Sequence, residues 1–303
     1  MEKNFRPGKS MLHCMSIDVE EHFQVAAFDN PTRRQEWETF ESRVERNVDK
    51  ILACLEERQI HSTMFVLGWI GERVPQLVRK IAEAGHEIAS HGYAHELVTT
   101  QTPERFRQDI RRAKRVLEDA CGQRVIGYRA PTFSIVQNTL WALPILSEEG
   151  YAYDSSIFPV YHDQYGIPDA DPLPHIRYWP EGSIWEIPPS TCQIGGMRLP
   201  VAGGGYFRII PYWILTRLLR RTETMGNPII FYLHPWEFDP EQPRMAGAAL
   251  SRIRHYWNLE KTEQRYRRLL RDFRFSSFRD ALPMVGDLYS NIPEQQPGDP
   301  VLT

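Results

Sequence analysis

The sequence lacks any hydrophobic run long enough to cross a membrane. Its longest apolar stretches, such as 63–70 and 229–233, fall well short of the ~18 residues that a transmembrane helix requires. The basic residues within 1–10 are followed by an apolar segment that His13 interrupts and that ends at Asp18, without a small-residue cleavage site. We therefore expect no membrane span and a cytoplasmic protein.

The chain also has few cysteines and no excess of positive charge. Lysine and arginine number 36 against 39 aspartate and glutamate residues, so the net charge is −3 and no basic field attracts a nucleic-acid backbone. Cys14, Cys54, Cys121 and Cys192 are too widely spaced for a CxxC metal site or a dense disulfide framework. We expect no nucleic-acid partner and four reduced, mostly buried thiols.

The hydrophobic pattern indicates an α/β protein. Apolar runs rich in β-branched residues, typical of buried strands, cover 12–19, 62–67, 86–89, 125–128, 184–187 and 229–233. Helical patterns alternate with the early strands over 44–55, 74–81 and 106–117. This alternation predicts a parallel sheet, as a barrel or a doubly wound sheet. No GxGxxG or GxxxxGK(S/T) motif follows a strand, which disfavours a nucleotide-binding fold.

The rest of the chain is less regular. Residues 158–206 are rich in proline and glycine, which predicts a long ordered insertion, and 240–257 have no clear period. Residues 260–273 return to a basic helical pattern, typical of a solvated helix. We expect a tail at 1–10, a barrel at 11–239, an extension packing on the barrel at 240–290 and a mobile tail at 291–303.

Three carboxylates, Asp18, Glu20 and Glu21, follow the first predicted strand. Crowded carboxylates repel one another unless a cation or hydrogen-bond donors compensate, so the group suggests a metal site or an acid/base pair. A solvated turn is the alternative. Reactive groups in parallel α/β folds collect at the carboxyl ends of strands, which favours the first interpretation.

Two histidines, His91 and His95, follow the third predicted strand in SHGYAH (90–95). Four residues apart on one helical turn, they can reach a single ion. Gly92 permits a tight exit from the strand that turns both rings inward. With a carboxylate from the first strand they form the ligand set of a catalytic zinc site. A non-haem iron oxygenase uses the same set, and an incidental histidine pair is a further alternative.

Three more residues lie at the ends of apolar runs. Arg129 is suited to holding a catalytic carboxylate ionised, or to an ordinary salt bridge. Asp154 is suited to chemistry or to capping a helix. His234 is a candidate general acid or a buried core histidine. Because so many of these residues end predicted strands of the same polarity, we favour the functional interpretation.

Taken in order, these motifs resemble the polysaccharide deacetylase, or NodB-homology, family of carbohydrate esterases. The resemblance spans most of 12–236 and rests on SIDVE (16–20), SHGYAH (90–95), YRAP (128–131), YDSS (153–156) and YLH (232–234). It implies a distorted (β/α) barrel of about seven strands. It also implies that Asp18 is the general base and that Glu20, or alternatively Glu21, ligates a metal.

The same resemblance implies roles for the other motifs. His91 and His95 would be the remaining metal ligands. Arg129 would orient the base, the Thr132 amide would bind the oxyanion, and His234 would be the general acid. The fourth motif, with Asp154, would form a wall of the pocket.

Two departures from the family pattern affect that wall. Phe133 stands where the third motif usually has glycine, and Ile157 stands where the fourth motif often has tryptophan. The stretches SIDVEEHF (16–23) and HPWEFDPEQPR (234–244) resemble the deacetylases of bacterial exopolysaccharide clusters associated with exosortase.

We therefore predict a Zn²⁺-dependent hydrolase that removes N-acetyl groups from amino sugars of a bacterial polysaccharide or its precursor, with Co²⁺, Ni²⁺ or Mn²⁺ as alternative metals. The expected substrate contacts are Thr132, Asp154, Trp236 and Tyr206, with Trp185 and Phe207 as further aromatic faces. The alternatives are an allantoinase-like cyclic amide hydrolase and an inert carbohydrate-binding relative. The sequence leaves the sugar, the linkage and a homo-oligomer open.

Overall fold

The computed structural model describes residues 11–28, 34–162 and 164–290. The tails predicted at 1–10 and 291–303 lie outside the described residues. No helix within the described part of the chain is both long and apolar enough to cross a membrane. Cys14, Cys54 and Cys192 are buried, Cys121 is partly buried, and all four thiols are free, as predicted.

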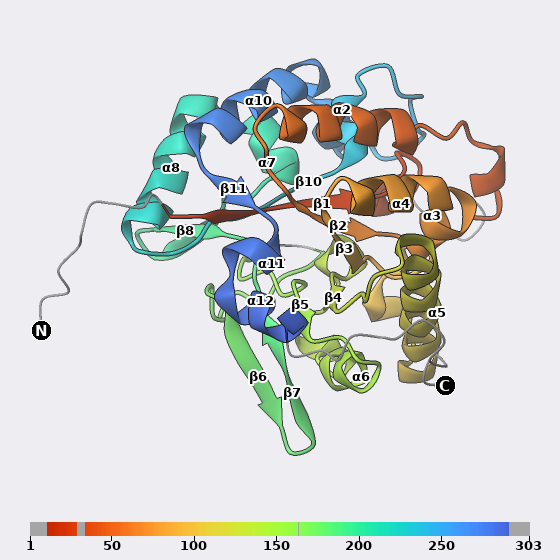
Figure 1. Ribbon diagram of the computed structural model, residues 1–303. Coiled ribbons are helices and arrows are strands. Elements are labelled where there is room, and N and C mark those ends of the chain that lie inside the picture. Colours follow the sequence, from red (N-terminus) through yellow and green to blue (C-terminus); the bar gives the residue numbers. More distant parts are fainter. Residues whose placement is uncertain (1–10, 29–33, 163, 291–303) are drawn as a thin grey trace, which may run out of the picture.

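A single sheet organises the molecule (Figure 1). Within the described residues, seven strands form a continuous parallel row, and the short strand β11 (Phe275–Ser276) pairs in parallel with β1 beside this row. In sheet order the seven are β10 (Ile230–Leu233), β1 (His13–Val19), β2 (Thr63–Val66), β3 (Glu87–Ser90), β4 (Gly127–Tyr128), β5 (Tyr153–Asp154) and β7 (Gly182–Glu186). The antiparallel strand β6 (His175–Trp179) extends the sheet beyond β7. The predicted α/β class is thus confirmed, with the parallel strands in the expected number.

The sheet curls towards a barrel without closing through a strand pair. The chain leaving β7 reaches the free edge of β10, where the Ser190 amide donates to the Ile230 carbonyl at 3.1 Å. Pro188 and Pro189 precede it and have no amide N–H, so a regular ladder cannot form here. Gly203 bridges Tyr232 farther along β10. A Cβ at Gly203 would lie 1.7 Å from the Tyr232 carbonyl oxygen, so glycine is required.

Amphipathic helices cover the outside of the sheet. They are α2 (Val44–Glu56), α3 (Gly68–Arg73), α4 (Pro75–Glu83), α5 (Pro103–Cys121), α6 (Ala142–Glu148), α7 (Gly204–Ile209), α8 (Tyr212–Thr224) and α10 (Thr262–Asp272). Figure 1 shows α2, α8 and α10 along one side of the sheet. The helices expected near 44–55, 74–81, 106–117 and 260–273 are present because each places its apolar residues on one buried face.

Two regions contain more structure than the sequence predicted. The insertion at 158–206 contains β6 and a separate hairpin of β8 (Thr191–Ile194) and β9 (Met197–Pro200). Residues 240–257, expected to be irregular, contain helix α9 (Ala249–Tyr256). In α9 the buried residue is His255, whereas Leu250 and Ile253 are exposed. The usual correspondence between apolar residues and the buried face therefore fails for this helix.

The end of the described chain returns to the centre of the sheet. Strand β11 (Phe275–Ser276) pairs with His13 and Cys14 of β1, and is followed by α11 (Phe278–Ala281) and α12 (Pro283–Ser290). Phe278 is fully buried, with its ring 5.7 Å from Phe65 and 5.9 Å from Tyr153. This segment therefore fills the inner side of the sheet below the carboxyl ends of its strands.

We predict that Phe278→Ala lowers the free energy of unfolding by about 3–5 kcal/mol, because it removes a fully buried ring and leaves a cavity. Met197→Ala, at an exposed position on β9, should change it by less than about 0.5 kcal/mol. Urea denaturation of both variants measures the difference. Equal, small effects would show that the C-terminal segment does not support the sheet.

Candidate metal and acid/base site

The predicted site residues meet at the carboxyl ends of the parallel strands. Asp18 lies in β1 and Glu20 just beyond it, while His91, Arg129 and His234 each follow the last residue of their strand. They surround a pocket of about 140 Å³. Its lining residues are Asp18, Glu20, Val25, Ala26, His91, His95, Thr132, Phe133, Tyr165, Tyr232, His234 and Trp236. The shared polarity of the strands brings these residues together, as the sequence predicted.

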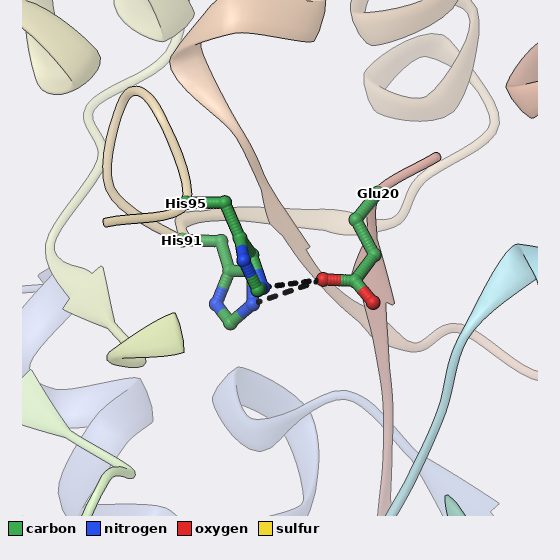
Figure 2. Close-up of side chains that lie close together, drawn as sticks. All are labelled: Glu20, His91 and His95. Carbon is green, nitrogen blue, oxygen red and sulfur yellow. Dashed lines mark ion pairs between the residues drawn. The ribbon is translucent and has the colours of Figure 1, made fainter. Parts of the chain in front are cut away.

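Glu20, His91 and His95 converge on one point (Figure 2). One carboxylate oxygen of Glu20, Oε2, lies 2.7 Å from Nε2 of His95 and 3.8 Å from Nε2 of His91. All three side chains are buried. Each offers one ligand atom, and the three atoms lie within 4.8 Å of one another.

The protonation states of this group suit a divalent metal. Burial lowers the pKa of His91 to about 4, so its ring is neutral at pH 7 and keeps a lone pair on the nitrogen that faces Glu20. Burial opposes ionisation of Glu20, but the neighbouring histidines hold the pKa of its carboxyl below the usual range. A carboxylate with imidazole nitrogens is a common zinc donor set, and iron accepts it too. The residues present therefore fit a metal.

The two histidines lie in a loop, not on the helical turn that their spacing predicted. Backbone twists bring them together instead, because both Gly92 and His95 have positive φ, 74° and 49°. The Arg129 carbonyl oxygen lies 2.8 Å from Nδ1 of His91, which leaves Nε2 directed at Glu20. Asp109 on α5 accepts a hydrogen bond from the Tyr93 amide at 2.8 Å and so anchors the loop.

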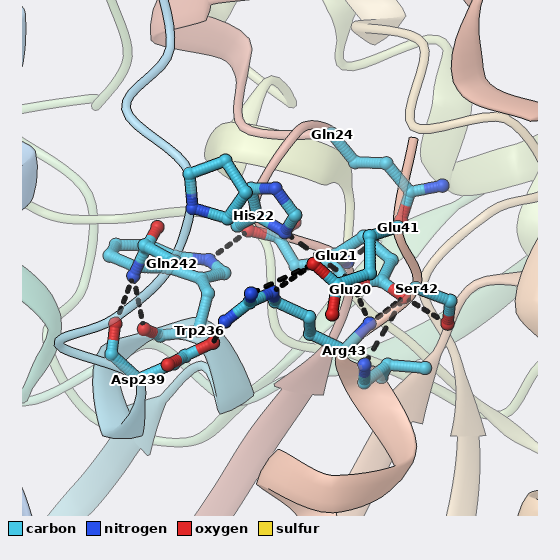
Figure 3. Close-up of polar contacts among 12 residues, drawn as sticks. Glu20, Glu21, His22, Gln24, Glu41, Ser42, Arg43, Trp236, Asp239 and Gln242 are labelled. Atoms are coloured by element: carbon cyan, nitrogen blue, oxygen red, sulfur yellow. Dashed lines mark hydrogen bonds and ion pairs between the residues drawn. The ribbon is translucent and has the colours of Figure 1, made fainter. Parts of the chain in front are cut away.

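Glu21, the alternative ligand, is occupied elsewhere. Its carboxylate accepts hydrogen bonds from the Arg43 and Val44 amides and from the Ser42 hydroxyl, at the start of α2. Carboxylates are stabilised at helix N-termini by the unpaired amides there. Figure 3 shows this contact beside Glu20, whose second oxygen, Oε1, accepts from the indole N–H of Trp236 at 2.8 Å. The geometry therefore directs Glu20, not Glu21, towards the histidines.

Arg129 fixes Asp18. The guanidinium is fully buried and donates to Oδ1 of Asp18 at 2.6 Å and to the Ser16 hydroxyl at 2.9 Å. Its other nitrogens donate to the hydroxyl and the carbonyl of Ser155, and its plane lies 4.1 Å from the centre of the Phe65 ring. Oδ2 of Asp18 therefore remains for contacts in the pocket, where it lies 3.9 Å from Nε2 of His234.

His234 lies at the end of a hydrogen-bonded series of three residues. Its Nδ1 lies 2.8 Å from Oε1 of Glu237, and Oε2 of Glu237 accepts from Nε of the buried Arg208 at 2.6 Å. Burial by itself lowers the pKa of His234, but the hydrogen bond to Glu237 and the nearby carboxylates together raise it to about 9. The imidazole is thus held protonated at neutral pH, with Nε2 facing the pocket.

Thr132 and Phe133 form a strained segment beside the pocket. Both are non-glycine residues with positive φ, 54° and 53°, which costs free energy and concentrates at functional sites. The Phe133 ring packs 4.9 Å from Tyr232 and 5.3 Å from Phe158. These aromatic contacts hold Phe133 in a backbone conformation that glycine would adopt without strain.

Several predicted substrate contacts need correction. Asp154 is fully buried, accepts from the Ser156 hydroxyl and does not line the pocket. Its carboxylate therefore holds the neighbouring chain at Ser156. Tyr206 lies on α7 outside the pocket lining, and Phe207 is buried in the core. Trp236 lines the pocket but is stacked between His234 and His255, with ring centres at 5.0 and 4.1 Å, so neither face is free for a sugar.

The sequence analysis missed four positioning residues: Asp109, Glu186, Arg208 and Glu237. The Glu186 carboxyl lies beside Asp154, where burial raises the pKa of both, that of Asp154 to about 6. Glu186 also accepts from the Ile157 amide. Only Glu237 carried a signal, since it follows the candidate acid by three residues and can reach back to it. The other three act across the fold from distant segments.

Comparisons with known proteins agree with this arrangement. Residues 29–152 match the family described as Polysaccharide deacetylase, and residues 155–283 match a Domain of unknown function (DUF3473). A peptidoglycan deacetylase-like protein of Gibberella zeae is 30% identical over 46% of this chain and 40% of its own length. A peptidoglycan deacetylase of Helicobacter pylori is 27% identical over 48% of each chain. The chain thus spans about half the length of these curated relatives or less.

Solved structures extend the similarity to the whole chain. The crystal structure of a polysaccharide deacetylase candidate from Mycobacterium smegmatis covers 99% of this chain and 98% of its own, at 22% identity and a TM-score of 0.63. The Puue allantoinase structure covers 96% and 94%, at 18% identity and a TM-score of 0.60. At these identities the likeness shows the fold alone. The family match over residues 29–152 shows that the first part of the chain is similar to polysaccharide deacetylases.

Proposed function

We propose that the protein removes N-acetyl groups from amino sugars of a bacterial polysaccharide or its precursor, using a divalent metal, zinc by preference, held by Glu20, His91 and His95. The observation that carries the proposal is a pair of unlike groups in one pocket. Asp18 is held by a cation, Arg129, while His234 is held by an anion, Glu237. A hydrolase of amides needs such a base and acid, and a carbohydrate-binding protein needs neither.

A bound metal would polarise the acetyl carbonyl and favour ionisation of the attacking water. Asp18 then accepts the water proton through Oδ2, because Arg129 occupies its other oxygen. The Thr132 amide donates a hydrogen bond to the oxygen that gains negative charge. His234 gives its Nε2 proton to the amine nitrogen as the C–N bond breaks. Acetate and a free amino sugar leave, and the two protein groups exchange their proton through solvent.

We also propose that the protein acts in the biosynthesis of a bacterial exopolysaccharide and that it is located in the cytoplasm. Four unpaired cysteines support an intracellular compartment. In spheroplasts the protein should resist externally added protease, and digestion there would contradict this location.

We also propose that the chain consists of a catalytic barrel, 11–239, and an extension, 240–290, that packs on the barrel. The pairing of β11 with β1 and the burial of Phe278 support an extension that is needed for folding of the barrel. Arg208 and His255 support the same view, because Arg208 donates to the His255 carbonyl across the proposed boundary.

The metal proposal predicts separate effects for ligands and their support. His91→Ala and His95→Ala should each abolish stoichiometric zinc binding and leave the circular dichroism spectrum unchanged. Trp236→Phe removes the N–H that orients Glu20, so zinc affinity should fall by roughly 10–100-fold. Trp257→Phe, at an exposed tryptophan, is the matched control. Full zinc content in the double variant His91→Ala/His95→Ala, measured by elemental analysis, would exclude this ligand set.

The acid/base proposal predicts different losses on two substrates. His234→Ala should lower kcat for an N-acetylated oligosaccharide by roughly 10²–10⁴-fold. It should harm hydrolysis of a nitrophenyl acetate much less, because that leaving group needs no proton. Asp18→Asn should impair both reactions. Released acetate and nitrophenol are measured separately, and equal losses in His234→Ala would show that His234 is not the general acid.

The same groups set the pH dependence. His234 must be protonated to act, so activity should fall as pH rises through its raised pKa of about 9. Glu237→Gln removes one of the negative charges that raise this pKa, and should move the basic limb of kcat/KM to lower pH. Glu260→Gln, at an exposed position, should leave the limb in place. An unchanged limb in Glu237→Gln would contradict the assignment.

A further inference from the structure

Helix α9 (Ala249–Tyr256) presents its apolar side to solvent. Leu250, Ile253 and Trp257 recur at intervals of three and four residues, which puts them on one face of the helix. All three are exposed, whereas His255 on the inner face is buried. A helix of a globular protein normally turns such a stripe towards the core, so the outward stripe requires an explanation.

Two more exposed apolar side chains lie on the adjoining chain. Ile209 ends α7, and Trp213 lies in the first turn of α8. This segment is joined to the end of α9, since Arg208 donates to the Trp257 carbonyl at 2.8 Å and Asn258 donates to the Arg208 carbonyl at 3.0 Å. We call Ile209, Trp213, Leu250, Ile253 and Trp257 the outer apolar patch. Each of the five is 50–61% exposed.

Positive charge gathers around the patch. The exposed residues Arg252 and Arg254 flank Ile253, and Arg217 lies 5.6 Å from the centre of the Trp213 ring. Helices α8, α9 and α10 are rich in arginine. These residues are Arg217, Arg220, Arg221, Arg252, Arg254, Arg265, Arg267, Arg268 and Arg271. The acidic residues of these helices are only Glu223, Glu263 and Asp272. Arg267 is paired with Glu57 and Glu263, and Arg268 lies 3.6 Å from Asp272, but arginines still outnumber acidic residues on these helices in a chain of net charge −3.

We propose that the outer apolar patch docks the protein on an anionic membrane surface. Leucine, isoleucine and tryptophan on one side of a helix, with arginines beside them, form the composition that binds at the lipid headgroup region. A second copy of this chain fits less well, because two such faces would bring arginines together. A carbohydrate fits less well too, because it gains little from aliphatic side chains.

The docking face is close to the pocket. His255, on the inner face of α9, stacks on Trp236 at 4.1 Å, and Trp236 stacks on His234 at 5.0 Å. A membrane bound to the outer face would therefore lie one helix away from the acid. Resting on the proposed function, this placement favours an amino sugar presented at the membrane, as in a lipid-linked precursor, over a free polymer.

Vesicle co-sedimentation of the full-length protein tests the proposal. We expect binding to vesicles of phosphatidylcholine with phosphatidylglycerol, weaker binding to phosphatidylcholine alone, and release by salt. Ile253→Ser/Trp257→Ser should weaken binding at least roughly tenfold, because two large apolar side chains can then no longer be buried in the lipid. Arg252→Gln/Arg254→Gln should weaken only the binding to anionic vesicles. Tyr178→Ser is the matched control, since Tyr178 is 76% exposed on β6, which Figure 1 shows far from α8 and α10.

Two results would overturn the proposal. One is absent vesicle binding, or binding that Ile253→Ser/Trp257→Ser leaves unchanged. The other is a dimer, seen by light scattering, that this double variant dissociates without any lipid binding, which would make the patch an interface between copies. Acetate release from a soluble N-acetylated oligosaccharide, measured on the same samples, tests the proposed function separately. Vesicle binding without acetate release would reject the hydrolase and keep the docking surface.

Discussion

A guanidinium buried at the centre of a sheet must find partners for its N–H groups, and Arg129 finds them in the parts of the site that need alignment. Its donors reach Asp18 and Ser16 on β1 and Ser155 after β5, and its own carbonyl oxygen holds Nδ1 of His91. One residue thus fixes Asp18, the proposed base, together with one candidate metal ligand and the neighbouring chain. Removing a partner from such a buried ion pair generally costs 3–5 kcal/mol, far more than the pair adds over an apolar substitute. The arrangement therefore resists small displacements, which acid/base geometry requires.

His234, the proposed acid, is held by charges of the opposite sign. Glu237 holds His234 protonated, and Arg208 behind it compensates the carboxylate, so charges of alternating sign run outward from the pocket. At Asp18 the order of charges is reversed, because the carboxylate faces the pocket and the Arg129 guanidinium lies behind it. Trp236 links His234 to the candidate metal ligands, since it stacks on His234 and donates to Glu20. Trp236 and Glu237 thus act on the site through Glu20 and His234.

The sequence predicted the parts of the molecule in which local pattern and tertiary environment agree. Strand β10 is a continuous apolar run and β1 is largely apolar, because both strands are buried, and polar residues at their carboxyl ends mark the site. Helix α9 was missed because its exposed side is the apolar one. Among the site residues, the sequence favoured Glu20 as the ligand but left Glu21 as an alternative. The structure distinguishes them, since Glu20 lies beside His91 and His95 whereas Glu21 caps α2. Asp109 and Arg208 act through contacts with distant segments, for which a single sequence has no periodic signal.

Phe133 adopts a backbone conformation that is more usual for glycine. The family usually has glycine at this position, and the structure gives Phe133 a φ of 53°, a value at which glycine is unstrained. The ring offsets the strain by packing against Phe158, Tyr165 and Tyr232. Tyr165 and Tyr232 also line the pocket, so the side chain that stabilises the strained turn simultaneously builds the wall. The Phe133 ring therefore stabilises the turn that carries Thr132 and at the same time helps to shape the pocket.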